Sequence, residues 1–318
     1  MYLKSIKGIA ALGLFVASVS ASATPLNEYN LILSGDFKVS GGSGHIEGKA
    51  FIGGDMVKGS VFAQHVNKSS TADTVKVVGN FTSNNAIHVE AGYVAYQGTF
   101  TGPTNICNGN GMGQSGCLKK VTDGSLTAEK NVLLTELQRQ SDYFKGLTTS
   151  ANFAITGDSN NKTFKYTGAA TDLAVFNIAA ADLANLNWSV DFGSAVNVLI
   201  NVTGTVFNAG NAHVNGFQNK ASNVLWNFAD AIELNFGDSW YGSILALNAT
   251  IKTNSNLNGA VAAKSYVGNG EIHDYKWNYT PPTPPEPPKP PVKVSEPSTL
   301  LLGLLGFGLV LLGRARRK

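Results

Sequence analysis

NLILSGDFKVSGGSGHIEGKAFIGGDMVKGSVF, residues 30–62, decides how the chain folds. Apolar triplets in this stretch alternate with Gly, Ser and Asp, which is typical of short β-strands joined by tight turns. The pattern recurs loosely, because His45–Gly54 reads HIEGKAFIGG, His88–Gly98 reads HVEAGYVAYQG and Asn256–Tyr266 reads NLNGAVAAKSY. Stacked short strands with glycine corners are what a β-solenoid requires, since one rung cannot bury its own face. A sandwich of glycine-rich strands gives a similar pattern, and we favour the solenoid.

Residues 125–147 depart from the β-pattern and predict a helix. Their apolar residues recur at helical spacing, and these are Leu126, Leu133, Leu137 and Phe144, with Val132, Leu134 and Tyr143 widening the stripe. Ser125 or Thr127 can cap the start and Gly146 the end of a helix of about 20 residues and about 30 Å. We expect a mainly β fold with one long helix, in which the amphipathic helix packs alongside a β-solenoid body.

The N-terminus has the three parts of a secretory signal peptide. Lys4 and Lys7 are basic, residues 8–19 form an apolar run, and Ala21-Ser22-Ala23 is a small-residue cleavage site. A buried amphipathic helix is the alternative, but the run has no polar face. We predict export by a signal peptide over residues 1–23, with cleavage after Ala23.

The C-terminus has the composition of a membrane-targeting tail. Residues 281–294, PPTPPEPPKPPVKV, predict a stiff, extended Pro-rich linker. The apolar run at residues 300–312 is shorter than the roughly 20 residues that comfortably span a bilayer. Basic residues favour the cytoplasmic side. We therefore expect this segment to insert the precursor into the inner membrane, with the terminal Arg/Lys cluster inside.

Residues 295–318 resemble the PEP-CTERM sorting signal of exported bacterial proteins. The resemblance rests on Glu296-Pro297-Ser298-Thr299, on the apolar run, and on Arg314, Arg316 and Arg317. Ser295 stands where the motif would have its first proline. The resemblance implies a Gram-negative host, an exosortase-type processing enzyme as a partner, and delivery to the cell surface or extracellular matrix. A tail retained as a plain membrane anchor is the alternative.

The charge of the body argues against a nucleic-acid partner. The whole chain has a formal net charge of +3. Six of its 24 basic residues lie in the two targeting segments, with only Glu296 among its 21 acids. This leaves 18 basic against 20 acidic residues between positions 24 and 294, a net charge of −2. We therefore expect no nucleic acid among its ligands.

Cys107 and Cys117 flank the loop NGNGMGQSG. Because exported chains mature in an oxidising compartment, a closely spaced pair predicts a disulfide. A metal site is the alternative, but it needs more ligands, and the loop contains no His or Asp.

The body, residues 24–280, resembles the choice-of-anchor A domain of bacterial surface proteins. The matching elements occur in order along nearly the whole body, and they are residues 46–54, 200–204, 224–231, 242–246, 257–263 and 270–273. The resemblance implies an exported surface protein without established catalysis, and some Gram-positive relatives are described as collagen-binding adhesins. It also implies a fold like the ice-binding β-helix with its covering helix.

Few residues suggest chemistry. Glu271 and His273 would share one face of a strand, where a metal or catalytic role is conceivable, but we expect a hydrogen-bonded pair that closes the last rung. Asp36, Asp55 and Glu47 lie among glycines without the spacing of a calcium loop, so turn-forming hydrogen bonds are expected.

Two aromatic residues are candidate ligand contacts. Trp240 and Tyr241 are adjacent, so they point to opposite sides of a strand. One of them could contact a sugar or a protein, and packing against the core or the helix is the expectation for both.

We therefore predict an exported, non-enzymatic cell-surface or extracellular-matrix protein that binds a polysaccharide or matrix protein and needs no cofactor. An ice-binding protein is the first alternative, but ALNATIKTNSNLNG, residues 246–259, offers only Thr250, Thr253 and scattered Asn. A polysaccharide-active enzyme on a β-helix is the second, and it would need clustered carboxylates or bases that the sparse charges do not obviously supply.

Overall fold

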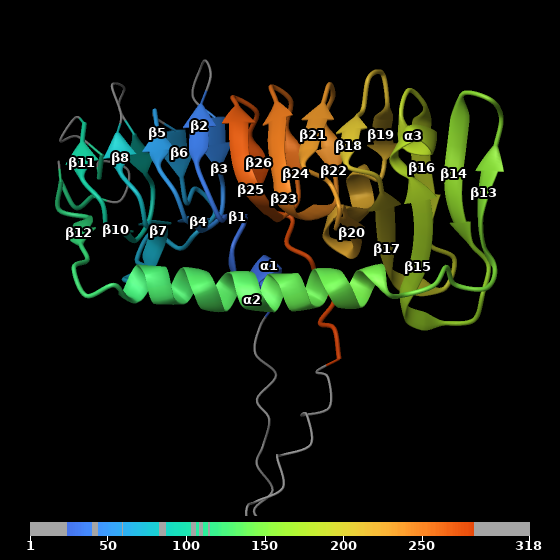
Figure 1. The fold of residues 1–318 in the computed structure, drawn as a ribbon, viewed down its shortest axis with the longest axis horizontal. Helices are drawn as coiled ribbons and strands as arrows, with labels where there is room; N and C mark the ends of the chain where they lie inside the picture. Colours follow the sequence, from blue (N-terminus) through green and yellow to red (C-terminus); the bar gives the residue numbers. More distant parts are fainter. Residues whose placement is uncertain are drawn as a thin grey trace, which may run out of the picture. The chain divides into compact units, whose positions relative to one another are not determined.

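The fold is a coil of short strands with one long helix along its side (Figure 1). The computed structural model describes residues 24–39, 44–58, 60–82, 87–102, 106–107, 111–113 and 115–282. The signal peptide with its cleavage after Ala23, residues 283–294 of the linker, and the whole sorting signal from Ser295 lie outside the described residues. The described residues up to Thr280 belong to one structural unit.

Each turn of the coil contributes strands to three faces. The helix-covered face consists of β12 (Leu118–Lys120), β10 (Tyr93–Tyr96), β7 (Asp73–Val77), β4 (Ala50–Ile52), β1 (Leu31–Leu33), the first parts of β25 (Val261–Gly268) and β23 (Ser243–Thr253), β20 (Val224–Asn227), β17 (Ala195–Thr203) and β15 (Thr171–Ala179). The strands within it pair in parallel.

The other two faces are named for residues on their outer sides. The lysine–threonine face consists of β11 (Phe100–Thr101), β8 (Phe81–Thr82), β5 (Met56–Val57), β2 (Phe37–Val39), the second parts of β25 and β23, β21 (Glu233–Phe236) and β18 (Val206–Asn208). The histidine face consists of β9 (His88–Val89), β6 (Ser60–Phe62), β3 (Gly44–Ile46), β26 (Ile272–His273), β24 (Leu257–Asn258) and β22 (Trp240–Tyr241), continued by β19 (His213–Gly216), β16 (Asn187–Asp191), β14 (Asn161–Tyr166) and β13 (Phe153–Gly157).

The predicted β-solenoid is confirmed, and its winding order is not the order of the sequence. The chain starts in the middle of the coil at β1 to β3 and winds outward to β12 at one end. Helix α2 (Ser125–Lys145) then runs back along the coil, and β13 to β26 wind from the far end towards the middle (Figure 1). Three short helical turns complete the unit: α1 (Pro25–Glu28), α3 (Ala180–Leu183) and the 3-10 helix η1 (Gln218–Asn223).

The two halves meet at a seam between β25–β26 and β1–β3. Leu31, Ile32 and Leu33 pair in parallel with Val261, Ala262 and Ala263. On the other faces β2 pairs with β25, and Ile46 of β3 pairs with Ile272 of β26. The seam is therefore made of ordinary ladder contacts between residues from opposite ends of the domain.

Asn30 fastens this seam from inside. Its side chain is fully buried and donates to the carbonyl oxygens of Gly259 at 3.3 Å and His273 at 3.0 Å. Its Oδ1 accepts the backbone N–H of Gly48 at 3.1 Å. One amide thus links three chain segments across the closure.

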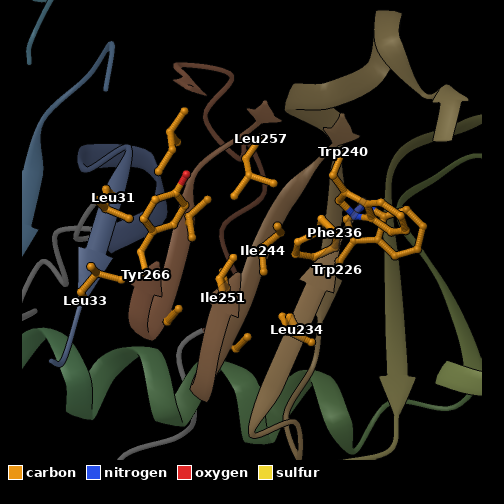
Figure 2. Packing of buried hydrophobic residues seen from close by; sticks show 14 of the residues in the cluster. Leu31, Leu33, Trp226, Leu234, Phe236, Trp240, Ile244, Ile251, Leu257 and Tyr266 are labelled. Atoms are coloured by element: carbon orange, nitrogen blue, oxygen red, sulfur yellow. The ribbon is translucent and has the colours of Figure 1, made fainter. Parts of the chain in front are cut away.

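Side chains inside the coil form one continuous apolar core (Figure 2). Phe37 stacks on Tyr266 with ring centroids 5.3 Å apart across the seam. Trp226 and Trp240 lie 5.1 Å apart in the C-terminal half. Because both halves contribute to the same core, packing and ladder hydrogen bonds support the same closure.

The corner between β1 and β2 repeats along the N-terminal half. The side-chain oxygens of Asp36, Asp55 and Asn80 accept the backbone N–H groups of Asp55, Asn80 and Thr99, at 2.9, 2.7 and 3.0 Å. The residue before each rung's polar residue is glycine, and a Cβ on Gly54 would lie 2.4 Å from Asp36 Oδ1. The corner therefore reads SGDF, GGDM, VGNF and QGTF in successive rungs. The turn role expected for Asp36 and Asp55 agrees with these bonds.

Helix α2 covers its face as the helical spacing predicts. Leu133, Leu137 and Phe144 are buried against outward residues of the covered strands, including Phe51 and Leu199. These strands are buried on both sides, which explains apolar runs such as AVNVLINV in β17. The helix of 21 residues is about 31 Å long, which corresponds to six or seven strand spacings of about 4.8 Å.

Two details of the predicted helix are wrong. Val132 is 70% exposed and does not widen the buried stripe, because it points away from the sheet. Neither Ser125 nor Thr127 is the N-cap: Gly124 occupies that position in a left-handed conformation, and Asp123 Oδ1 accepts the N–H of Ser125 at 2.9 Å.

An asparagine ladder holds the end of α2. Asn201 donates to the carbonyl oxygen of Phe144 at 2.7 Å and to Asn177 Oδ1 at 2.9 Å. Asn227 donates to Asn201 Oδ1 at 2.9 Å and to the carbonyl oxygen of Ser141 at 3.1 Å. Phe144 is among the last four residues of the helix, whose carbonyl groups have no intrahelical partner, and the bond to Ser141 ties the preceding turn to the same ladder.

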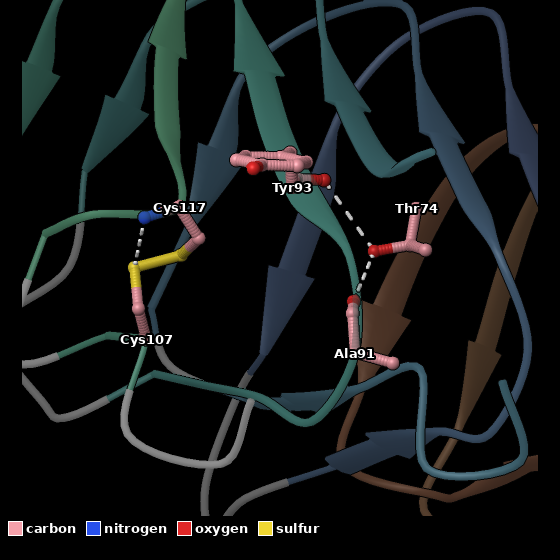
Figure 3. Close-up of a disulfide and its surroundings, with 5 residues drawn as sticks. All are labelled: Thr74, Ala91, Tyr93, Cys107 and Cys117. Carbon is pink, nitrogen blue, oxygen red and sulfur yellow. Dashed lines mark hydrogen bonds between the residues drawn. A yellow bond between two sulfur atoms is a disulfide. The ribbon is translucent and has the colours of Figure 1, made fainter. Parts of the chain in front are cut away.

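A disulfide joins Cys107 and Cys117 near the β12 end of the coil (Figure 3). Both residues are buried, and the N–H of Cys117 donates to Cys107 Sγ at 3.0 Å. Thr74 ties the adjacent strands by donating to the carbonyl oxygen of Ala91 at 2.6 Å. The cross-link and these bonds close the end of the coil over its core.

Replacing Asn30 by alanine tests the seam. Asn30→Ala removes one acceptor and two donor contacts in a buried site, so we expect a loss of about 2–3 kcal/mol in the free energy of unfolding. Urea denaturation measures this loss. Asn208→Ala, at an exposed strand position, is the control and should change the free energy of unfolding by less than about 0.5 kcal/mol. Equal small effects would show that Asn30 does not fasten the seam.

Acidification tests the corner ladder. Burial opposes the charged form of Asp36, but the Asp55 N–H and the Lys38 ammonium outweigh it and lower the pKa of this carboxyl. A lowered pKa contributes stability that is present above the ordinary value near 3.9 and is lost as pH falls through the folded value. Asp36→Asn keeps the Oδ1 acceptor without the charge. When the pH is lowered from 7 to 3, the free energy of unfolding should fall more for the wild type than for Asp36→Asn, and the two falls should differ by less than about 1 kcal/mol. Urea titrations measure both values. Identical losses would show that the charge of Asp36 does not stabilise the corner.

Candidate functional site

The lysine–threonine face presents one straight row of outward side chains. The register brings one residue from each of its strands into line. The row is Thr101, Thr82, Val57, Lys38, Val267, Lys252, Asn235 and Asn208. Neighbouring positions are about 4.8 Å apart. A polymer extended along the coil would therefore meet a similar side chain at every strand.

Buried side chains alternate with the row along each strand and pack beneath it. Phe37 and Val39 flank Lys38 and point into the core, while Phe81 precedes Thr82 and also points inward. Phe81 packs edge-on against Phe100 of β11, with ring centroids 5.1 Å apart. A packed layer thus supports the exposed row and fixes its spacing.

Both lysines of the row are balanced by carboxylates. Lys38 Nζ lies 3.0 Å from Asp36 Oδ2, and Lys252 Nζ lies 2.8 Å from Glu233 Oε2. The hydrogen bond from Lys252 lowers the pKa of Glu233. The row is therefore rich in hydrogen-bonding groups, while its charges are locally compensated.

Threonines do not repeat along this face. Thr250 lies beside Glu233 in register, outside the main row, and Thr253 is buried with 6% exposure. Only Thr82 and Thr101 are neighbours within the row, on β8 and β11. The described part of the face thus lacks the sustained threonine array that the ice-binding alternative needs.

On the histidine face, Glu271 and His273 form a hydrogen-bonded pair. His273 Nε2 lies 3.0 Å from Glu271 Oε2, and its Nδ1 lies 2.7 Å from Asn258 Oδ1. The other carboxylate oxygen of Glu271 lies 3.4 Å from His45 Nδ1 across the seam. His45 could not be assigned to this cluster from the sequence, because it lies at the opposite end of the domain.

Glu47 forms a second group on this side of the coil. Its Oε2 accepts the backbone N–H of Asp274 at 2.8 Å and lies 3.1 Å from His65 Nδ1. The side chain of Glu47 thus links the first and last rungs, whereas the sequence predicted a hydrogen bond within its own turn.

The adjacent aromatic residues lie on opposite sides of β22. Trp240 is fully buried in the core beside Trp226. Tyr241 is half-buried on the outer side, level with Asn258 of β24. Tyr241 is therefore the one of the pair that a ligand could contact.

The described residues contain neither a metal-ligand cluster nor a membrane-spanning helix. No group of three or more His, Cys, Asp or Glu side chains in these ranges is arranged to hold a metal ion. None of the helices in the same ranges is long and apolar enough to cross a membrane. The apolar run at residues 300–312, expected to insert into the membrane, lies outside them.

Several solved structures are similar to the chain. The DUF3494 domain of an ice-binding protein of Shewanella frigidimarina is 12% identical, with 80% of this chain and 96% of that chain covered and a TM-score of 0.33. Ice-binding proteins of Antarctomyces psychrotrophicus and of an Arctic yeast are each 12% identical, with TM-scores of 0.30 and 0.31. The alignments cover 80% and 81% of this chain, and 97% and 94% of those chains. Likenesses at this level do not transfer an activity.

Sequence comparison identifies the family. No curated protein matches the chain. The family model of an ice-binding-like adhesive domain matches residues 22–274, which is nearly the whole predicted body. The resemblances to choice-of-anchor A and PEP-CTERM proteins stay predictions. The chain belongs to the family of ice-binding-like adhesive domains.

Proposed function

We propose that the protein is an exported, non-enzymatic adhesive protein whose lysine–threonine face binds a polysaccharide or a matrix protein. The row of eight in-register side chains on that face carries the proposal. Membership in an adhesive domain family supports a surface or extracellular location. A signal peptide over residues 1–23 and an exosortase-processed tail over residues 295–318 would deliver it there.

The chemistry of the row suits an extended polymer. Asn, Thr and Lys offer hydrogen bonds to hydroxyl and carbonyl groups, while Val57 and Val267 offer apolar contacts to ring or side-chain carbons. Compensated charges reduce the cost of desolvating the face on contact. Affinity would then come from many weak, evenly spaced contacts instead of one deep pocket.

Ice binding is the second candidate, favoured by the family description. The mixed row of Asn, Lys, Val and Thr argues against it, since water in ice presents one repeating spacing to a regular array. Catalysis has less support, because no group of three or more His, Cys, Asp or Glu side chains among the described residues is arranged to hold a metal ion.

A pair of matched double variants tests the adhesive face. Val57→Glu with Thr82→Arg disrupts two neighbouring positions near the β11 end of the row, whereas Val132→Glu with Thr135→Arg makes the same changes on the exposed side of α2. We expect at least a tenfold loss of affinity at pH 8 for exopolysaccharide or matrix protein from the source organism in the first variant only, because charged, bulkier groups break the row. Biolayer interferometry measures it, and thermal melts check that both variants fold.

Three outcomes would count against the proposal. Equal loss in both variants would place binding elsewhere, and no binding by the wild type would remove the adhesive function. Thermal hysteresis or capture by growing ice, abolished by Val57→Glu with Thr82→Arg, would establish the ice-binding alternative instead.

A further inference from the structure

All five histidines of the chain lie on one side of the coil. His45, His88, His213 and His273 are in β3, β9, β19 and β26, and His65 lies three residues after β6. His45 and His88 flank Val61 in register, so they stand two strand spacings apart, about 10 Å. The histidines therefore follow the coil axis along the histidine face.

Most of these histidines contact a carboxylate. His65 contacts Glu47 at 3.1 Å, and His213 contacts Asp238. The hydrogen bond from His213, the largest of several causes, helps to lower the pKa of Asp238. His45 and His273 share Glu271, one on each carboxylate oxygen.

The surroundings of His273 accommodate a doubly protonated ring. Asn258 Nδ2 donates to the carbonyl oxygen of Trp240 at 3.3 Å, which turns Asn258 Oδ1 towards His273 Nδ1. Glu271 Oε2 faces the other ring nitrogen. Both ring nitrogens of His273 therefore have a hydrogen-bond acceptor opposite them.

Protonation of the histidines reverses the charge of this face. Along β9 to β19, four carboxylates lie beside the five histidines, and these are Glu47, Glu90, Asp238 and Glu271. Further along the same face, Lys165 pairs with Asp191 at 3.7 Å, and Lys162 acts on the nearby Asp158, so these charges cancel. Asp274 and Lys276 pair with each other at 3.3 Å and cancel. Four negative charges with neutral histidines thus become one net positive charge with five imidazoliums. Histidine is the side chain whose charge ordinarily changes between pH 5 and 8.

We propose that the histidine face is a second, acid-activated surface for an anionic polysaccharide. At neutral pH the carboxylates repel the polymer. In acid, a line of imidazoliums spaced along the coil faces the acidic groups of a chain extended in the same direction. The site is separate from the lysine–threonine face, and it gives the adhesive protein a ligand that it holds in acidic surroundings and releases in neutral ones.

Immobilised alginate tests the proposal, with dextran as the uncharged probe. At low, constant ionic strength the folded domain should bind alginate at least tenfold more tightly at pH 5 than at pH 8, while binding to dextran does not change. His45→Asn with His88→Asn and His213→Asn should remove most of this difference. Lys38→Gln with Lys252→Gln, on the other face, should leave it in place.

A variant with fixed charge separates the site from a general effect of acid. Replacing all five histidines by lysine gives the face the +1 charge of its acid form also at pH 8, so this variant should bind alginate there at least tenfold more tightly than the wild type does. Circular dichroism at both pH values checks that each variant is folded. Two results overturn the proposal. One is absence of alginate binding at pH 5, and the other is loss of the pH effect in Lys38→Gln with Lys252→Gln instead of in the histidine variants. A negative result here leaves the proposed adhesive function untouched, because that function is tested at pH 8 with variants of the lysine–threonine face.

Discussion

The pairing of β25 with β1 is the contact on which the rest of the fold depends. A solenoid built from one continuous winding can fray from either end, because each rung contacts only its neighbours. Here the first and last rungs meet in the middle, so neither half is complete without the other. Asn30, Glu47 and the stacked rings of Phe37 and Tyr266 all act across this seam.

The long helix leaves two of the three faces of the coil open to solvent. Helix α2 returns the chain from the β12 end towards the far end, and its length covers about six or seven of the nine strand spacings of this face. In doing so it covers the middle of one face. The remaining faces differ in chemistry: one carries charge-compensated polar and aliphatic residues, and the other carries every histidine of the chain. The two faces can therefore serve different ligands.

Local patterns predicted the parts of this structure, and long-range register determined the rest. The triplets of residues 30–62 and the spacing of Leu133, Leu137 and Phe144 were enough for the strands and the helix. The corner motif that begins with SGDF was visible in the sequence, but its polar residue varies between Asp, Asn and Thr. The outer row and the contact between His45 and Glu271 depend on which strands become neighbours, and a winding order that starts in the middle hides that from the sequence.

Hydroxyl-radical footprinting of the protein, with and without exopolysaccharide from the source organism at pH 8, tests the central claim most directly. It reports side-chain accessibility, so it distinguishes the outer faces even where backbone amides are already paired. The account predicts protection of Val57 and Val267 on binding, with no change at Val132, which is 70% exposed on α2. Protection at Val132 with unchanged Val57 and Val267 would contradict it.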